Sequence, residues 1–201
     1  MLRRGLPFAD ICCLQPEAAP QSARGYDRRS GYDYDVIGAE ALLARMRVAN
    51  GRLVLPDGVS YRLLVLPDRR VMTPRLLARI KELVEAGATA VGPRPEKSPS
   101  LSGYPACDAE VARLADALWG ACDGTAVNEH RCGKGRVVWG VGPERVLALA
   151  GVPPDFAGPA RLSFIHRADG DEDIYFVASP LPHDVRAACT FRVSGKAPEL
   201  W

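Results

Sequence analysis

The feature that most constrains the fold of this chain is a strand signal followed by a capped helix and a second strand signal. Residues 63–66 read Leu-Leu-Val-Leu, an uninterrupted apolar run typical of a central strand that is covered on both faces. Thr73-Pro74 then supplies a helix N-cap and a first-turn proline. Apolar residues recur at helical spacing until Gly87, a natural helix end, and residues 89–92 indicate the next strand. This order predicts a parallel sheet covered by helices.

The alternation of strands and helices extends from residue 6 to about residue 151. Asp57-Gly58 predicts a hairpin between residues 52–56 and 61–67. We therefore predict an α/β fold over residues 1–152, with a flavodoxin-like (class I amidotransferase-like) parallel sheet and helices on both faces. The other predicted segments are strands at 6–14 and 136–140 and helices at 39–46, from Asp108 onward, and at 143–150.

Beyond residue 152 the pattern changes to strands without helices. Residues 161–167, 173–178 and 185–193 predict an antiparallel meander with turns between its strands. Three strands cannot close a β-sandwich. We therefore expect residues 153–201 to form a short antiparallel β segment. It either packs on the α/β sheet or is the beginning of a truncated sandwich, and the abrupt end of the chain favours the second.

Composition excludes several classes of partner. The chain has 26 Lys and Arg against 24 Asp and Glu, and a net charge of +2 gives no reason to expect a nucleic acid or an anionic membrane surface. No apolar run approaches the roughly 18–20 residues that span a bilayer. The basic start resembles a signal peptide, but Asp10 interrupts its apolar stretch and no small-residue cleavage site follows. A cytoplasmic location is the default expectation.

The sequence offers no complete catalytic, cofactor or metal site. The turn after the strand at 89–92 has neither the cysteine nor the serine of an amidotransferase elbow. Gly140-Val-Gly142 begins a dinucleotide fingerprint, but Arg145 stands where the third glycine belongs. Six cysteines occur without a Cys-x-x-Cys pair, so neither a disulfide framework nor a zinc site is expected. Cys122, His130 and Cys132 come nearest to a ligand set.

Three polar clusters are the candidate rim of a binding site. The first mixes aromatic rings with carboxylates, as sugar sites do, although it could instead anchor a long loop. The second follows the central strand and could bind an anion, a neighbouring domain or the next helix. The third could hold a cation or simply form a β-turn. Their candidate residues are Tyr32, Asp33, Tyr34 and Asp35; Asp68 and Arg69; and His166 and Arg167.

The chain resembles glycoside hydrolase family 106, the α-L-rhamnosidase-like family, over nearly its whole length. Segments that carry the resemblance include Gly31-Tyr-Asp-Tyr-Asp-Val-Ile37, Leu53-Val-Leu-Pro-Asp-Gly58, Ala115-Asp-Ala-Leu-Trp119, Phe164-Ile-His-Arg167 and Phe191-Arg-Val-Ser-Gly-Lys196. The resemblance implies a catalytic (β/α) barrel, with two glutamates as acid and base, that precedes the region seen here. No glutamate of this chain is assigned to either role. Gly38 stands where the family usually has asparagine.

The resemblance implies an accessory middle region that is enzymatic by ancestry and inactive alone. Its expected partners are the missing catalytic barrel and rhamnose-containing glycans, and its expected role is scaffolding at the rim of the barrel's active site. The docking surface for the barrel is expected to be apolar and to include the loop at 15–31. Two alternatives stay open: a free-standing carbohydrate-binding or interaction module, and a small hydrolase with a degenerate amidotransferase-like site.

Overall fold

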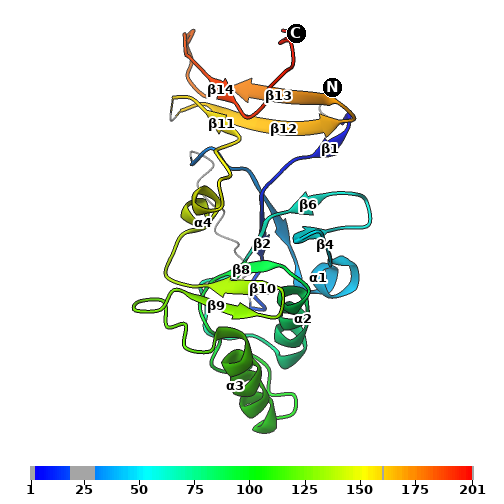
Figure 1. The fold of residues 1–201 in the computed structure, drawn as a ribbon, viewed down its shortest axis with the longest axis vertical. Coiled ribbons are helices and arrows are strands. Elements are labelled where there is room, and N and C mark those ends of the chain that lie inside the picture. The colour runs from blue at the N-terminus through cyan, green and yellow to red at the C-terminus, as the bar shows by residue number, and fades with distance from the viewer. Residues whose placement is uncertain (1–2, 19–29, 160, 201) are drawn as a thin grey trace.

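A mixed six-stranded sheet forms the centre of the computed structural model, which describes residues 3–18, 30–159 and 161–200 (Figure 1). Five of its strands are mutually parallel, as expected for the segments around Ile11, Val65, Ala90 and Val138. The sixth strand, β9, is antiparallel at one edge and was not predicted, so the sheet is mixed rather than fully parallel. The strands in spatial order are β3 (Tyr34–Ile37), β2 (Ile11–Leu14), β7 (Leu63–Val65), β8 (Thr89–Val91), β10 (Gly135–Val138) and β9 (Glu129–Cys132).

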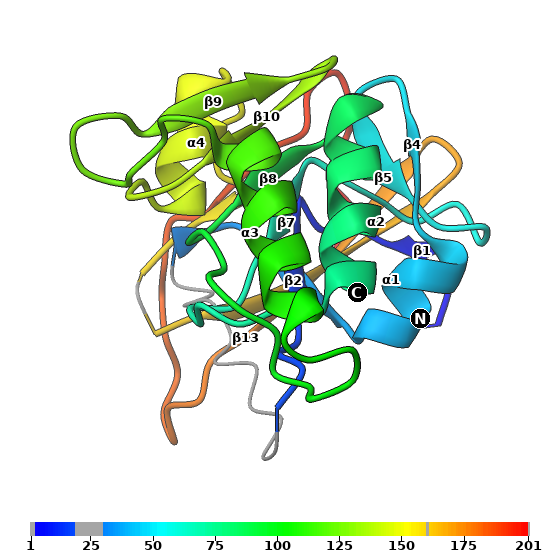
Figure 2. The same cartoon turned by 90° about the horizontal axis from the view of Figure 1, so that it is seen from below.

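Alternate residues of the central strands face two separate hydrophobic cores. Cys12, Leu64 and Ala90 face the core under helices α1 (Ala39–Arg45), α2 (Pro74–Glu85) and α3 (Ala106–Trp119). Their neighbours Ile11, Leu63, Val65 and Val91 face the core under α4 (Pro143–Leu149). Helices thus cover both faces of the sheet, as predicted. Figure 2 shows α2 and α3 side by side over one face.

The helix signals were accurate at α2 and misplaced at α3. Thr73 caps α2 through its Oγ1, which accepts from the Leu76 amide at 3.4 Å, and Glu17 accepts from the Thr73 amide and hydroxyl at 2.8 Å each. Helix α3 begins at Ala106, before the predicted Asp108. The Asp108 carboxylate lies inside the first turn and accepts from the Ser98 amide at 2.9 Å. It fastens the preceding loop instead of capping the helix.

The prediction of one strand over 6–14 is wrong. Residues Leu6–Pro7 form β1, which pairs antiparallel with β12 (Ser163–Asp169) at the far end of the chain. Residues Ile11–Leu14 form β2 in the central sheet. The break falls at Asp10, whose carbonyl oxygen accepts from the amides of Arg62 and Leu63 at 2.8 and 3.1 Å. A buried acidic residue between two apolar runs marks the change of sheet.

A small three-stranded sheet lies beside the central one. The predicted Asp57-Gly58 hairpin is present between β5 (Arg52–Val54) and β6 (Ser60–Tyr61), although its second arm ends before the central strand β7. A second hairpin was missed between β4 (Arg47–Ala49) and β5. Its turn is Asn50-Gly51, both residues at positive φ (51° and 73°), which is a strong sequence signal for a tight hairpin.

The C-terminal strands do not form the predicted meander. Strands β12 and β13 (Glu172–Ala178) pair antiparallel, but β1 supplies the third strand of their sheet. Within 185–193 only Thr190–Phe191 are extended in a ladder, as β14, and they pair with β11 (Phe156–Ala157). In Figure 1 these strands lie at one end of the long axis and α3 at the other. The division at residue 152 stays a prediction.

Three further expectations concern membrane-spanning helices, the cysteines and the docking surface. Among the described residues, no helix has the length and apolar character that crossing a bilayer requires. All six cysteines carry free thiols. Part of the predicted docking surface, residues 19–29, lies outside the described residues.

We predict that Leu77→Ala lowers the free energy of unfolding by about 2–5 kcal/mol, because the fully buried Leu77 of α2 would leave a cavity in the core. The matched control is Leu149→Ala, at the end of α4, where the side chain is 68% exposed and the change should stay within about 0.5 kcal/mol. Urea unfolding of both variants measures the difference. Equal losses at the two positions would contradict the placement of Leu77 in the core and of Leu149 at the surface.

Candidate functional site

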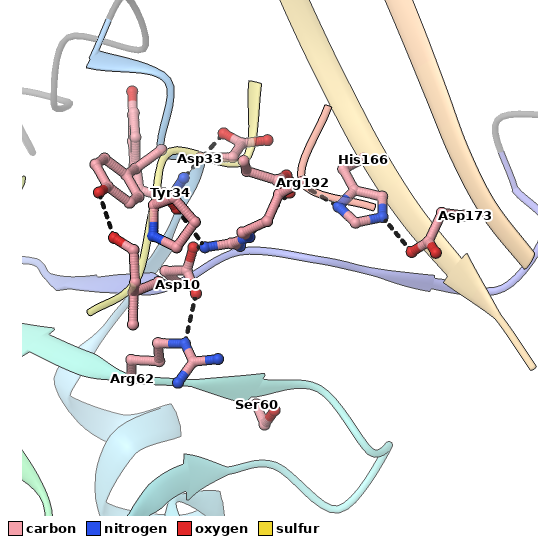
Figure 3. Close-up of polar contacts among 12 residues, drawn as sticks. Asp10, Asp33, Tyr34, Ser60, Arg62, His166, Asp173 and Arg192 are labelled. Carbon is pink, nitrogen blue, oxygen red and sulfur yellow. Dashed lines mark hydrogen bonds and ion pairs between the residues drawn. The ribbon is translucent and has the colours of Figure 1, made fainter. Parts of the chain in front are cut away.

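A chain of alternating charges joins the central sheet to the C-terminal strands (Figure 3). It is centred on Asp10, which is 1% exposed. The Asp10 carboxylate accepts from Arg62 Nε at 3.0 Å on one oxygen and from Arg192 Nη2 at 2.7 Å on the other. Because an unpaired buried carboxylate costs several kcal/mol, these two arginines compensate for the burial of Asp10.

Arg192 carries the chain of charges into the C-terminal strands. Its Nη2 lies 3.5 Å from Asp155 Oδ1, and its Nη1 donates to the Pro153 carbonyl at 2.8 Å. Asp155 is also 1% exposed, and its Oδ1 accepts from the Tyr175 hydroxyl at 2.9 Å. One guanidinium group therefore contacts the buried carboxylates of both Asp10 and Asp155 through its Nη2.

His166 lies between two carboxylates. Its Nδ1 is 2.9 Å from Asp155 Oδ2 and its Nε2 is 2.8 Å from Asp173 Oδ1. Carboxylates only accept, so both hydrogen bonds form when both ring nitrogens carry protons. The ring is also stacked on Tyr175, with centroids 4.1 Å apart, and packs on Phe8 at 4.4 Å. His166 is thus fixed on its faces and at both nitrogens.

Burial and neighbouring charges shift the pKa values of Asp173 and Tyr175. Burial acts to raise the pKa of the Asp173 carboxyl, but hydrogen bonds from Lys196 and His166 outweigh it, and this pKa lies below its ordinary value. Burial and the neighbouring Asp155 carboxylate raise the pKa of Tyr175, which stays a neutral donor. The network is therefore a closed set of donors and acceptors. Such a set fastens elements together and leaves its carboxylates committed to partners inside the protein.

The first predicted cluster lies along the entry to β3 and is divided between contacts. Tyr32 is buried and donates its hydroxyl to the Val152 carbonyl at 2.7 Å, which anchors the start of β3 beside α4. Asp33 is 8% exposed and accepts from the Tyr34 amide at 2.9 Å. Asp35 accepts from the Tyr61 hydroxyl at 3.0 Å. Tyr32 and Asp35 thus make structural contacts, the anchor role that the sequence left open.

The other two predicted clusters lie apart. Asp68 and Arg69 are exposed on the loop after β7. His166 belongs to the charge network, whereas Arg167 donates to the carbonyls of Arg4 and Gly5 at 2.6 and 2.5 Å and so holds the N-terminal segment against β12. Adjacent strand residues point to opposite faces, and this separates the two neighbours.

Sequence reasoning missed most members of the network. These residues include Asp10, Arg62, Asp155, Tyr175, Arg192 and Lys196. Asp10 was read only as an interruption of an apolar stretch, although an acid inside a strand-forming run is itself a signal that a cation must be near. Arg192 gave no local signal, because its partner Asp10 lies 182 positions away.

The structure supports no metal site among the residues it describes. The nearest ligand set in the sequence is not assembled: His130 Nδ1 is 3.0 Å from the Leu118 carbonyl oxygen. Burial raises the pKa of the Cys13 thiol to about 12 and raises that of Cys12 as well, so neither is a reactive thiolate.

Comparisons with known proteins show that the chain is similar to parts of much longer proteins. A family profile described as alpha-L-rhamnosidase matches residues 1–201. The chain is 36% identical over 203 residues to a Formosa agariphila protein named "Putative beta-glucuronidase", covering 100% of this chain and 16% of that protein. It is similar to the solved structure of a rhamnosidase from Novosphingobium sp. PP1Y, with 30% identity, a TM-score of 0.83, and coverage of 97% of this chain and 19% of that one. The chain spans less than a fifth of either protein.

We predict that Arg192→Met lowers the free energy of unfolding by about 3–5 kcal/mol, because it leaves the buried Asp10 and Asp155 carboxylates undercompensated. The control is Arg113→Met, which breaks an exposed ion pair with Glu110 and should cost at most about 1 kcal/mol. Chemical denaturation measures both. An Arg192→Met variant as stable as the control would show that the network does not hold the C-terminal strands on the central sheet.

A second prediction concerns pH. Because the folded-state pKa of Asp173 is lowered, its contribution is fully present above the unfolded-state pKa, about 3.9, and is lost as the pH falls through the folded value. Between about pH 5 and about pH 2, Asp173→Asn should therefore lose less stability than the parent chain. Asp68→Asn, on an exposed loop, is the matched control. Parallel pH–stability curves for parent and Asp173→Asn would contradict the assignment.

Proposed function

The chain belongs to the α-L-rhamnosidase family, glycoside hydrolase family 106, and from this membership we propose that it is an accessory, non-catalytic part of a rhamnosidase-type glycoside hydrolase. The observation that carries the proposal is the coverage. The whole chain aligns with relatives of which it spans 16% and 19%. Those proteins therefore contain a large additional portion in which the catalytic barrel expected for the family would reside.

The pairing of the buried carboxylates supports a non-catalytic role. Glycoside hydrolysis by an acid–base pair needs one carboxyl group with a raised pKa and a second carboxylate across the substrate. Here Asp10, Asp155 and Asp173 lie against Arg62, Arg192 and Lys196 respectively, and the pKa of Asp173 is lowered rather than raised. These groups serve the fold and offer no free acid to a glycosidic oxygen.

The proposal includes a flavodoxin-like identity for the central sheet. The five parallel strands follow the spatial order β3-β2-β7-β8-β10, which corresponds to the order 2-1-3-4-5 of flavodoxin-like sheets. Helices on both faces support the same reading. The antiparallel edge strand β9 is an addition to that arrangement.

In this proposal the chain serves as a rigid scaffold. The charge network fixes the C-terminal strands on the α/β sheet, so that surfaces on both can be presented together to the catalytic barrel. Tyr32, Asp33, Tyr34 and Asp35 stay the rim candidates of the first cluster, and Asp68 and Arg69 are exposed where a neighbouring domain could reach them. The barrel and rhamnose-containing glycans are the proposed partners.

We predict that the purified chain releases no sugar from aryl α-L-rhamnosides between about pH 4 and about pH 9, a range that covers carboxylate chemistry. Barrel enzymes gather their acids from loops of several barrel strands, and groups without a pocket forgo most of the gain from proximity and orientation. Release of the aryl group, followed by absorbance, is the measurement. The matching full-length enzyme is the positive control.

Turnover that survives purification and disappears in Asp33→Asn or Asp35→Asn would contradict the proposal, because it would place the active site inside this chain. The same substitutions are expected to leave the flat baseline unchanged.

A further inference from the structure

A cleft lies at the carboxyl ends of three parallel strands, away from the charge network. Its volume is about 360 Å³, within the range of small-molecule sites. The loop after β7 contributes Arg70, the loop after β8 contributes Arg94 and Glu96, and the residue after β10 is Trp139. The loop after α3 closes the cleft with residues 120–123. Ligands of open α/β sheets bind at this end of the strands.

The walls of the cleft are tied to one another. The loops after β7 and β8 are joined by a parallel bridge between Val71 and Lys97, by the Glu96 amide donating to the Arg70 carbonyl at 2.8 Å, and by an Arg70–Glu96 ion pair at 2.5 Å. Arg94 is ion-paired with Asp116 of α3. A site whose walls are already fixed loses little entropy when a ligand binds.

Trp139 provides a flat apolar surface inside this polar cleft. Gly124, at φ +76°, lies directly against the indole: a Cβ there would stand 2.7 Å from the ring. The backbone of Trp139 is held by two hydrogen bonds with Asn128, both at 2.9 Å. The Arg70 guanidinium carbon lies over the ring, 5.6 Å from its centroid, within the range of a cation–π contact. Arg70, whose side chain is 58% exposed, therefore shares the ring face and has to shift when a ligand stacks there.

Donors and acceptors surround the indole. Asp123 Oδ1 accepts from the amides of Thr125, Ala126 and Val127 at 2.8, 2.9 and 3.0 Å. These backbone hydrogen bonds lower the pKa of Asp123 to about 2, so it is a permanent acceptor. Glu96 adds a second carboxylate, and Arg70 and Arg94 add fixed donors. Hydroxyl groups can both donate to such carboxylates and accept from such guanidinium groups.

We propose that this cleft binds a neutral sugar residue of a glycan, with hydroxyls bonded to Arg94, Glu96 and Asp123 and an apolar sugar face against Trp139. An amphipathic ring of this kind matches an indole bordered by both donors and acceptors. The site takes its ligand class from the proposed function, in which the chain is part of a carbohydrate-degrading enzyme.

The charge balance favours a neutral ligand over an anion. Arg70 and Arg94 are already paired with Glu96 and Asp116, and Asp123 adds a further negative charge. An anionic ligand would have to displace these carboxylates, whereas a hydroxyl can share their remaining lone pairs.

The test is a titration of the chain with methyl α-L-rhamnoside and methyl β-D-glucopyranoside, with inorganic phosphate and D-glucuronate as anionic probes, followed by amide and indole NMR shifts. We expect a neutral glycoside to shift the Trp139 indole signal with a millimolar Kd, about 1–10 mM. Trp139→Ala should weaken binding at least about tenfold, because it removes the apolar platform. Glu96→Gln, which keeps the size of the side chain, should weaken it about threefold or more.

Two controls and a folding check frame the result. Tyr104→Ala removes a 64% exposed aromatic ring outside the cleft, and Arg113→Leu removes an exposed arginine of α3; neither should change the affinity. Circular dichroism checks the fold of each variant. If Trp139→Ala does not fold, the affinity of Glu96→Gln for the neutral glycoside tests the proposal. Saturation by the anions alone, or neutral-sugar shifts that are insensitive to Trp139→Ala and Glu96→Gln, would overturn the proposal. No shift up to about 100 mM of either neutral glycoside would also overturn it. None of these outcomes depends on rhamnose release, so the proposed function is tested separately.

Discussion

The ion pair between buried Asp10 and Arg192 is the interaction on which the position of the C-terminal strands against the central sheet depends. Asp10 is 1% exposed, and burying its carboxylate without cations would lower the stability of the fold by several kcal/mol. Arg62 meets it from the central sheet side and Arg192 from the C-terminal strands. Satisfying one carboxylate thus requires the first and last parts of the chain to meet. β1, just before Asp10, pairs with β12, and Arg192, just after β14, contacts Asp10.

Most members of the network contact more than one partner. Arg192 contacts two carboxylates. Asp155 contacts Arg192, Tyr175 and His166, and His166 contacts two carboxylates. Removing one member leaves others buried without partners, and breaking such a set costs far more than breaking an exposed pair. A scaffold benefits from this, because the C-terminal strands are held in one position relative to the α/β sheet.

The cleft around Trp139 differs from the network in the way its polar groups are used. In the network, buried donors and acceptors form hydrogen bonds with one another. In the cleft, the polar groups are also paired, Arg70 with Glu96, Arg94 with Asp116 and Asp123 with backbone amides, but they border an open volume. The two regions correspond to two tasks: one holds the domain together, and the other offers a surface for recognition.

The sequence by itself determined the local elements and the family. Apolar runs and caps predicted the central strands and α2, because burial on both faces and capping leave signals within a few residues. The sequence did not predict the split at Asp10 or the pairing of β1 with β12. Nor did it predict the network, or the meeting of Arg70, Arg94 and Trp139 in one cleft. These features join residues that are far apart in the chain. Only the tertiary structure decided them, because a buried charge or a cleft is defined by neighbours that the fold brings together, and those neighbours leave no periodic pattern in the sequence.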